Sequence, residues 1–320
     1  MALPPSFVGN LTLPVVCAPM FIVSGPRLVI AQCKSGLVGT MPSLSVRPKE
    51  AFEPALEHIR AELEAYRRAH PELPVGPFGI NLIAHGSNQR LAHDLEACVR
   101  QRVPLVITSL GPSRAIVERV HSYGGVVFHD VTNLRHARKA IAEGVDGLVA
   151  VAAGAGGHAG RIHPFALVNE IREIFDGTVV LSGAISDGRA VAAAIALGAD
   201  MAYLGTRFIA TQEADAVPAY QQMLIDSAAE DICSSNYFSG VSGSYLRPSI
   251  VAAGLDPDNL PSREVGSLHV TDAGTKTKAW KDIWSAGQGV GTIHDVPAVA
   301  ELVHRMRDEF AMAKARLCEM

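Results

Sequence analysis

The feature that most constrains this chain is a regular alternation of short apolar runs with helix-like segments. Each apolar run has the length and β-branched content of a strand buried on both faces, as in a parallel sheet. Eight such runs occur before residue 208: Val15–Ala18, Gly36–Thr40, Phe78–Asn81, Leu105–Thr108, Val126–His129, Gly147–Val151, Val179–Ser182 and Met201–Leu204. Strict alternation of strands and helices predicts an α/β protein with a parallel sheet.

The segments between these runs have helical patterns. They include Lys49–Arg68, Gln89–Arg102, Ser113–His121, Asn133–Glu143, Phe165–Phe175 and Gly188–Leu197. Eight strand–helix repeats favour closure into a (β/α)8 TIM barrel over an open, doubly wound sheet. The Rossmann alternative is weaker, because no GxGxxG follows the first strand and opens a helix. Glycines and polar residues cluster instead after the later strands, where TIM barrels place their active-site loops.

The alternation stops after Phe208. Ala214–Ala228 has a helical pattern, and a Ser-, Gly-, Asn- and Pro-rich stretch then runs from residue 234 to about residue 274. Such a stretch is too long for a simple loop in a compact domain. We therefore predict a barrel formed by residues 1–212 and 277–320, with an inserted lid or small helical subdomain at residues 213–276. Val296–Arg316 is expected to be a closing amphipathic helix.

Composition restricts the class of protein. An apolar fraction of 48% and a charged fraction of 19% indicate a well-filled globular core. The net charge of −4 gives no electrostatic signature of nucleic-acid or membrane binding. The start MALPPSFVGN lacks the pattern of a secretory signal, and no run approaches the ~20 apolar residues of a membrane span. Five scattered cysteines without metal-ligand spacing indicate reduced thiols and a cytoplasmic protein with no metal site.

Two glycine-containing turns follow the seventh and eighth predicted strands. The first contains Ser182, Gly183 and Ala184, and a helix begins immediately after it; the second contains Gly205 and Thr206. Backbone N–H groups of such turns, together with a helix N-terminus, form an anion site suited to phosphate. Either turn alone is equally well an ordinary strand-to-helix connection, but the pair lies where barrels clamp phosphate. The spacing leaves open whether that phosphate belongs to FMN or to a sugar phosphate.

His158 is the leading candidate for a catalytic residue. It follows the sixth strand in the segment Ala153–Arg161, which reads AGAGGHAGR. A single histidine is more often structural, but small neighbours let a flat ring and a substrate approach the backbone here. An imidazole exchanges protons near neutral pH. His163, before Pro164, is expected to start the next helix, and His129 ends the fifth strand at the barrel mouth, within reach of a cofactor.

Several phrases together resemble one family. They are Cys17–Met20 (CAPM), Phe78–Leu82 (FGINL), Ala155–Gly160 (AGGHAG), Ser182–Gly188 (SGAISDG), Leu197–Asp200 (LGAD), Leu204–Phe208 (LGTRF) and Trp284–Gln288 (WSAGQ). With these phrases the chain resembles the nitronate monooxygenase (2-nitropropane dioxygenase) family of FMN-dependent TIM-barrel enzymes over nearly its whole length. No single phrase is sufficient; AGGHxG combined with GTRF at this separation is specific.

The resemblance implies a role for each matching residue. His158 is then the catalytic residue beside the flavin, handling the proton or negative charge of the substrate. The cofactor-binding residues are Pro19, Met20, Asn81, His129, Asp146, Gly157, Ser182, Gly183, Ala184, Gly205, Thr206, Ser285 and Gln288. Many relatives carry Lys-Cys-Thr after the fifth strand where this chain has His129-Asp130-Val131-Thr132, and we expect His129 to replace that lysine.

The implied activity is oxidation of alkyl nitronates by O2 to a carbonyl compound and nitrite. Two alternatives come from the same group of enzymes: NAD(P)H-dependent quinone reduction and FMN-dependent enoyl-ACP reduction. The last would need a basic surface, and the lid has few clustered bases (Arg247, Arg263, Lys276, Lys278 and Lys281). A non-catalytic barrel that binds a phosphorylated ligand also remains open, because fold alone does not determine function.

Overall fold

The computed structural model describes residues 2–262 and 282–319. Eight parallel strands form one sheet in the order β1-β9-β8-β6-β5-β4-β3-β2, and a bridge between Val16 and Val38 joins its two edges. The strands are β1 Val15–Cys17, β2 Gly39–Pro42, β3 Phe78–Ile83, β4 Leu105–Ser109, β5 Val126–Val131, β6 Gly147–Val151, β8 Thr178–Ser182 and β9 Met201–Leu204. All eight predicted strands are confirmed, within a few residues at their ends, and the fold is a TIM barrel.

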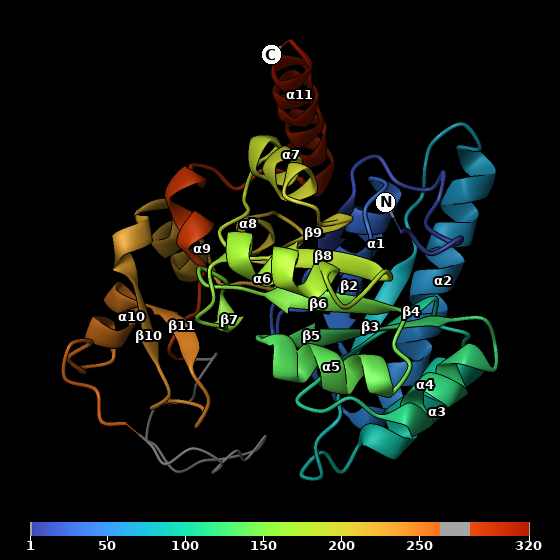
Figure 1. Cartoon of the computed structure of the whole chain (residues 1–320), viewed down its shortest axis with the longest axis horizontal. Helices are drawn as coiled ribbons and strands as arrows, with labels where there is room; N and C mark the ends of the chain where they lie inside the picture. Colours follow the sequence, from blue (N-terminus) through green and yellow to red (C-terminus); the bar gives the residue numbers. More distant parts are fainter. Residues whose placement is uncertain (1, 263–281, 320) are drawn as a thin grey trace.

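Helices surround this barrel (Figure 1). They are α1 Pro26–Lys34, α2 Phe52–Ala69, α3 Leu91–Arg100, α4 Arg114–His121, α5 Leu134–Ala142, α6 Pro164–Arg172, α7 Gly188–Ala196, α8 Thr206–Ile209, α9 Pro218–Ile225 and α11 Val299–Cys318. A further helix, α10 Arg247–Ala252, lies apart from the barrel. The closing helix α11 packs against α7 and α1, and its C-terminal half extends away from the barrel. Within the described ranges, no helix combines the length and hydropathy required to cross a bilayer.

Alternate residues of each strand face the interior of the barrel. The inward cluster contains Phe7, Val16, Val38, Leu105, Ile107, Phe128, Val149, Val180 and Met201. The intervening residues, such as Val106, Val127 and Leu148, pack against the helices. Phe7 comes from the segment before β1 and lies 6.1 Å from Phe128, ring centroid to ring centroid. The amino-terminal segment thus helps to fill the interior with apolar side chains, and the barrel is a packed core rather than a pore.

A second, three-stranded sheet lies beside the barrel (Figure 1). Its order is β10-β11-β7, and all its pairs are antiparallel; β7 is Gly157–His158, β10 is Ile232–Ser235 and β11 is Gly243–Leu246. Cys233, Phe238, Tyr245, Ile250 and Ile283 form a small apolar cluster of their own. The division into a barrel and an inserted unit stays a prediction. Of the predicted lid bases, Arg263, Lys276, Lys278 and Lys281 lie outside the described residues.

Candidate active site

Four loop segments meet at the carboxyl ends of the strands. They follow β6, β8 and β9, and the fourth is the returning segment at residues 285–289. The amides of Ala184 and Gln288 both donate to the Gly154 carbonyl, at 3.2 and 2.9 Å, and the Gly287 amide donates to Thr206 Oγ1 at 2.9 Å. A Cβ on Gly287 would lie 2.7 Å from the Gly154 oxygen, so only glycine fits this crossing. The structure therefore brings the predicted turns together.

The two turns after β8 and β9 have the chemistry of a phosphate cradle. Gly183 has φ +144° and Ala184 has φ +54°, so the turn is in the conformation that favours glycine. Among the described residues, the amides of Gly183 and Gly205 have no hydrogen-bond acceptor, and the hydroxyl of Ser186 is buried without a partner. Gly183 and Gly205 are half-buried, whereas the Ser186 hydroxyl is fully buried, and a buried polar atom without a partner is rare in folded proteins and indicates a missing one. These residues fit a phosphate group.

The helix that begins after this turn does not contribute to the cradle, in contrast to the sequence prediction. Asp187 caps α7 by accepting from the Ala190 amide at 2.8 Å, and Glu309 of α11 accepts from the Gly188 amide at 2.8 Å. Two carboxylates thus occupy the N-terminus of α7, where an anion would otherwise bind. The backbone turn itself is left as the donor set for phosphate.

His158 is held in the short strand β7, which pairs with β11. Its Nε2 lies 3.1 Å from Ser239 Oγ, and Ser239 donates its own hydroxyl proton to the Val241 carbonyl at 3.0 Å. Ser239 must therefore accept from Nε2–H, which fixes the tautomer with the lone pair on Nδ1. Burial lowers the pKa of His158 to about 4, so the imidazole is neutral at pH 7.

Ser285 links the strand that carries His158 to the rest of the small sheet. Its hydroxyl accepts from the Gly157 amide at 2.8 Å and donates to the Ser244 carbonyl at 2.5 Å. Its carbonyl accepts from the Tyr220 hydroxyl, and the Tyr220 ring stacks on Trp284 at 5.0 Å between centroids. The only proton of the Ser285 hydroxyl is thus used inside the protein. Ser285 is placed to support the His158 strand rather than to donate to a ligand.

Three inward-facing polar side chains lie on β3, β4 and β5. Asn81 donates to Ser109 Oγ at 2.7 Å, and Ser109 donates to Asp130 Oδ2 at 2.6 Å. The other oxygen, Asp130 Oδ1, is buried and has no hydrogen-bond partner among residues 2–262 and 282–319, although the residue as a whole is half-buried. Burial raises the pKa of Asp130 to about 6, and the bond from Ser109 opposes this. We call Asn81, Ser109 and Asp130 the polar floor of the site.

Comparison of the sequence with protein families identifies the family of this chain. A model of the nitronate monooxygenase family matches residues 8–309. The chain belongs to the nitronate monooxygenase family. The resemblance predicted from sequence motifs is therefore confirmed.

Individual members of the family, and proteins related to it, are distant in sequence. A nitronate monooxygenase of Paraburkholderia phytofirmans is 27% identical over 356 residues, covering 95% of this chain and 94% of that protein. The (3aS,4S,5R,7aS)-5-hydroxy-7a-methyl-1-oxo-octahydro-1H-indene-4-carboxyl-CoA dehydrogenase of Rhodococcus jostii is 28% identical over 238 residues. That match covers 74% of this chain and 64% of the relative, so the chain matches less than two thirds of the relative's length.

A solved structure supports the fold. The nitroalkane oxidase of Streptomyces ansochromogenes superimposes with a TM-score of 0.76 at 24% sequence identity. The superposition covers 97% of this chain and 99% of that one. At this identity the likeness shows a shared TIM barrel and carries no assignment of substrate.

Two predicted nitronate monooxygenase site residues lie elsewhere. His129 faces outward between the strands and helices: its Nδ1 lies 2.7 Å from Thr108 Oγ1, and His136 of α5 is among the charges acting on it. Asp146 precedes β6, at the amino end of the barrel, where it accepts from the Val127 amide at 2.7 Å and contacts His121. Asp146 is thus at the opposite end of the strands from the carboxyl-end loops, and His129 points away from the barrel interior, so neither residue joins the others.

The remaining predicted residues lie where the carboxyl-end loops meet. Pro19 and Met20 follow β1, and Met20 Sδ lies 3.6 Å from the position that a Gly205 Cβ would occupy. Ser182 ends β8, and Gly157 precedes His158 in β7. The sequence interpretation missed Ser109, Asp130 and Ser239. The sequence did contain a signal for Asp130. Side chains alternate between the two faces of a strand, so Asp130 lies on the same face as the buried Phe128 two residues earlier.

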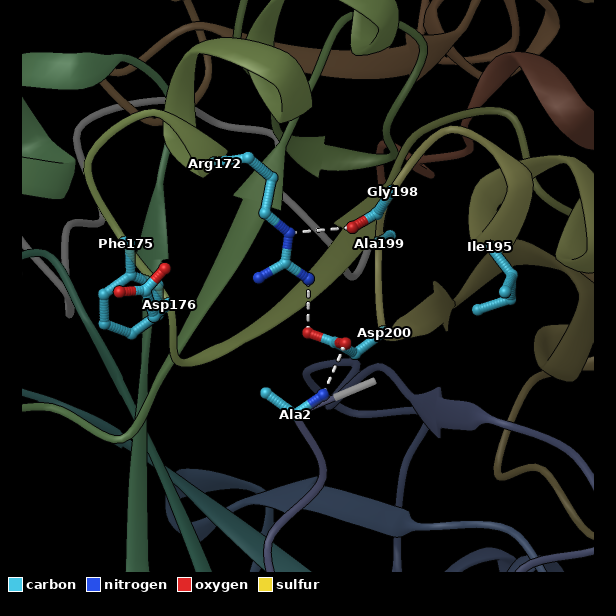
Figure 2. Close-up of a pocket in the computed structure, with 8 residues that line it drawn as sticks. All are labelled: Ala2, Arg172, Phe175, Asp176, Ile195, Gly198, Ala199 and Asp200. Carbon is cyan, nitrogen blue, oxygen red and sulfur yellow. Dashed lines mark hydrogen bonds and ion pairs between the residues drawn. The ribbon is translucent and has the colours of Figure 1, made fainter.

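A pocket of about 380 Å³ lies away from this site (Figure 2). It is lined by residues that end α6 and α7 or precede β9, together with Ala2, so it is at the amino end of the barrel. Two of its charged groups are paired: Arg172 forms an ion pair with Asp200, and Asp200 accepts from the Ala2 amide at 2.7 Å. The arrangement anchors the amino-terminal segment and accounts for these residues structurally.

Proposed function

We propose that this chain binds FMN and catalyses the oxidation of alkyl nitronates by O2 to a carbonyl compound and nitrite. The observation that carries the proposal is the meeting of the Gly183–Ala184 and Gly205–Thr206 turns with the loop that leads to His158. Family membership supports flavin dependence. The proposal goes beyond family membership in two respects: it names FMN as the flavin and an alkyl nitronate as the substrate.

The cofactor would be held at two ends. The turns after β8 and β9 would hold the FMN phosphate through the amides of Gly183 and Gly205 and through the Ser186 hydroxyl. Asn81 and the backbone of Pro19 and Met20 would lie along the ring system. FMN, when bound, supplies the electron acceptor for the substrate and the electron donor for O2.

His158 would act on a proton of the substrate. Its Nε2–H is directed to Ser239, so Nδ1 is the basic atom of the neutral ring. A neutral imidazole can take the α-proton of a nitroalkane and leave the nitronate beside the flavin. The lowered pKa of His158 favours this role over that of a permanent positive partner for the anion.

The decisive experiment is anaerobic stopped-flow mixing of the purified protein with propionate 3-nitronate, NADH and NADPH in turn. We expect a yellow protein whose flavin absorbance is bleached by the nitronate without a nicotinamide. Bleaching by NADH or NADPH alone would assign a reductase. A colourless protein that takes up no FMN on reconstitution would leave a ligand-binding barrel and defeat the proposal.

A reductase or dehydrogenase is the second candidate, and one observation favours it. The relative from Rhodococcus jostii is named a carboxyl-CoA dehydrogenase and is as similar to this chain as the nitronate monooxygenases are. The same stopped-flow series separates the two, because NAD(P)H-dependent reduction of quinones or acyl thioesters requires fast reduction by the nicotinamide. A cytoplasmic location also remains part of the proposal, supported by five unpaired cysteines.

A further inference from the structure

The side chains that face the interior of the barrel change from apolar to polar toward the carboxyl ends of the strands. Phe128 on β5 and Ile107 on β4 face inward in the apolar cluster, and two residues further along the same strands Asp130 and Ser109 face inward. Since side chains alternate along a strand, Asp130 points the same way as Phe128 and opposite to His129. The polar floor therefore lies between the apolar interior and the carboxyl-end loops, on the side where the site is.

The hydrogen bonds of the polar floor run in one direction. Asn81 donates to Ser109, and Ser109 donates to Asp130 Oδ2, so Oδ2 is committed as an acceptor. A proton on this carboxyl group must therefore sit on Oδ1, which is the oxygen without a partner. Native proteins seldom leave a buried carboxyl oxygen unpaired, so a ligand atom is expected opposite Oδ1.

Few other charges bear on this carboxyl group. The neighbouring strand β6 presents the apolar side chains Val149 and Val151 to the interior. Tyr203 of β9 faces the same interior, and its pKa is raised by burial first and then by Asp130 and Cys17. The raised pKa of Asp130, about 6, follows from burial rather than from a nearby anion. A small electrostatic change at Oδ1 would therefore move this group across neutral pH.

We propose, building on the FMN function proposed above, that Asp130 presents Oδ1 to the flavin ring and binds one proton when the ring is reduced. The substrate supplies the electrons, and water supplies the proton that forms the new O–H bond at Oδ1. Reduction adds negative charge to the ring, and a negative charge close to a carboxylate favours its protonated form. Reoxidation by O2 returns the proton to water. Asp130 thus compensates the added negative charge at the carboxyl end of the barrel.

The test is the pH dependence of the midpoint potential of the bound flavin, which does not depend on turnover. The holoprotein, Asp130→Asn and Asp226→Asn are titrated between about pH 7 and 8, above the Asp130 pKa of about 6, so that the carboxyl group is ionised before reduction. Asp226 is an exposed carboxylate that ends α9, so it controls for loss of one negative charge. We expect the unchanged protein and Asp226→Asn to bind one more proton per two electrons than Asp130→Asn. That difference is about 30 mV for each tenfold change in proton concentration.

Each outcome decides the question. Equal slopes in the unchanged protein and in Asp130→Asn would overturn the proposal while leaving the FMN function intact. Failure of the unchanged protein to bind FMN would overturn both. If Asp130→Asn does not fold, the infrared difference spectrum of the unchanged holoprotein replaces it. Reduction should produce a protonated-carboxyl C=O band that shifts when aspartate carries a heavy carbon isotope in its carboxyl group, and absence of that band would overturn the proposal.

Discussion

Ser285→Ala tests whether the strand that carries His158 depends on a single hydroxyl group. Ser285 joins two backbone groups that belong to different strands: it accepts from the Gly157 amide and donates to the Ser244 carbonyl. The substitution removes one oxygen and leaves both backbone groups without their partner. The methyl side chain of alanine fits the same space, so the loss of hydrogen bonding dominates the change.

The expected cost follows from the two groups left unpaired. An unsatisfied buried donor or acceptor costs about 1–3 kcal/mol. Ser244 is buried, and it bears the larger share, whereas the half-buried Gly157 amide recovers part of its loss by binding water. The sum is roughly 2–4 kcal/mol of the free energy of unfolding of the small sheet.

Urea unfolding followed by tryptophan fluorescence measures this cost, because Trp284 stacks on Tyr220 next to Ser285. The midpoint should fall at unchanged slope. Thr292→Ala is the matched control: its exposed hydroxyl donates to the Gly289 carbonyl at 3.2 Å, and its loss should change the free energy of unfolding by less than about 0.5 kcal/mol. If Ser285→Ala is no more destabilising than this control, Ser285 does not support the small sheet as argued.

Four further predictions concern the site and the barrel. His158→Asn should retain FMN but lose roughly 100-fold or more in kcat/KM with the neutral nitroalkane, whose α-proton His158 would take; full activity with the nitroalkane would remove His158 from the chemistry. Gly183→Asp should abolish FMN retention, read from the flavin-to-protein absorbance ratio, because a carboxylate would stand against the phosphate; normal flavin content would mean that the turn is misassigned. Asp130→Asn should remove a pH dependence from apoprotein stability. The pKa of Asp130 in the folded protein, about 6, exceeds the ordinary 3.8, so between these pH values the native carboxyl group holds a proton that the unfolded chain releases. The free energy of unfolding of the unchanged protein should therefore fall by up to about 3 kcal/mol relative to that of the variant as pH rises from 4 to 7. Parallel plots of the free energy of unfolding against pH for the two proteins would contradict this. Phe7→Ala should cost about 3–5 kcal/mol in urea unfolding, because Phe7 is fully buried in the barrel interior, with flavin content unchanged; a loss below 1 kcal/mol would show that the amino-terminal segment does not pack there.

The sequence allowed the barrel to be predicted because its strands are buried on both faces. Such strands read as continuous apolar runs, and length and spacing suffice to find them. Because such runs show no alternation of polar and apolar residues, they do not reveal which side chains face the barrel interior and which face the helices. His129 was predicted to face the cofactor, but Asp130 occupies the inward position, because a shift of one residue in a strand moves a side chain to the other face.

The small sheet was not predictable from local pattern. β7 has only two residues, Gly157–His158, and two residues carry no periodicity. Its partner β11 is 85 positions later in the chain, so only tertiary structure reveals the pairing. Asp146 was misplaced for a related reason: it matched the site by motif similarity, whereas the start of β6 puts it at the far end of the strands. Ser285 was found by resemblance, but its role as a link came only from its contacts.

The pairing of β7 with β11 has a consequence for engineering of this enzyme. Exchanging residues 213–276 for the corresponding segment of a relative would replace β11, the strand whose hydrogen bonds hold the backbone of His158. A chimera designed to alter only substrate preference would therefore also relocate the imidazole. Segment swaps in this family should keep residues 243–246 from the host chain, so that the backbone of His158 keeps the strand with which it pairs.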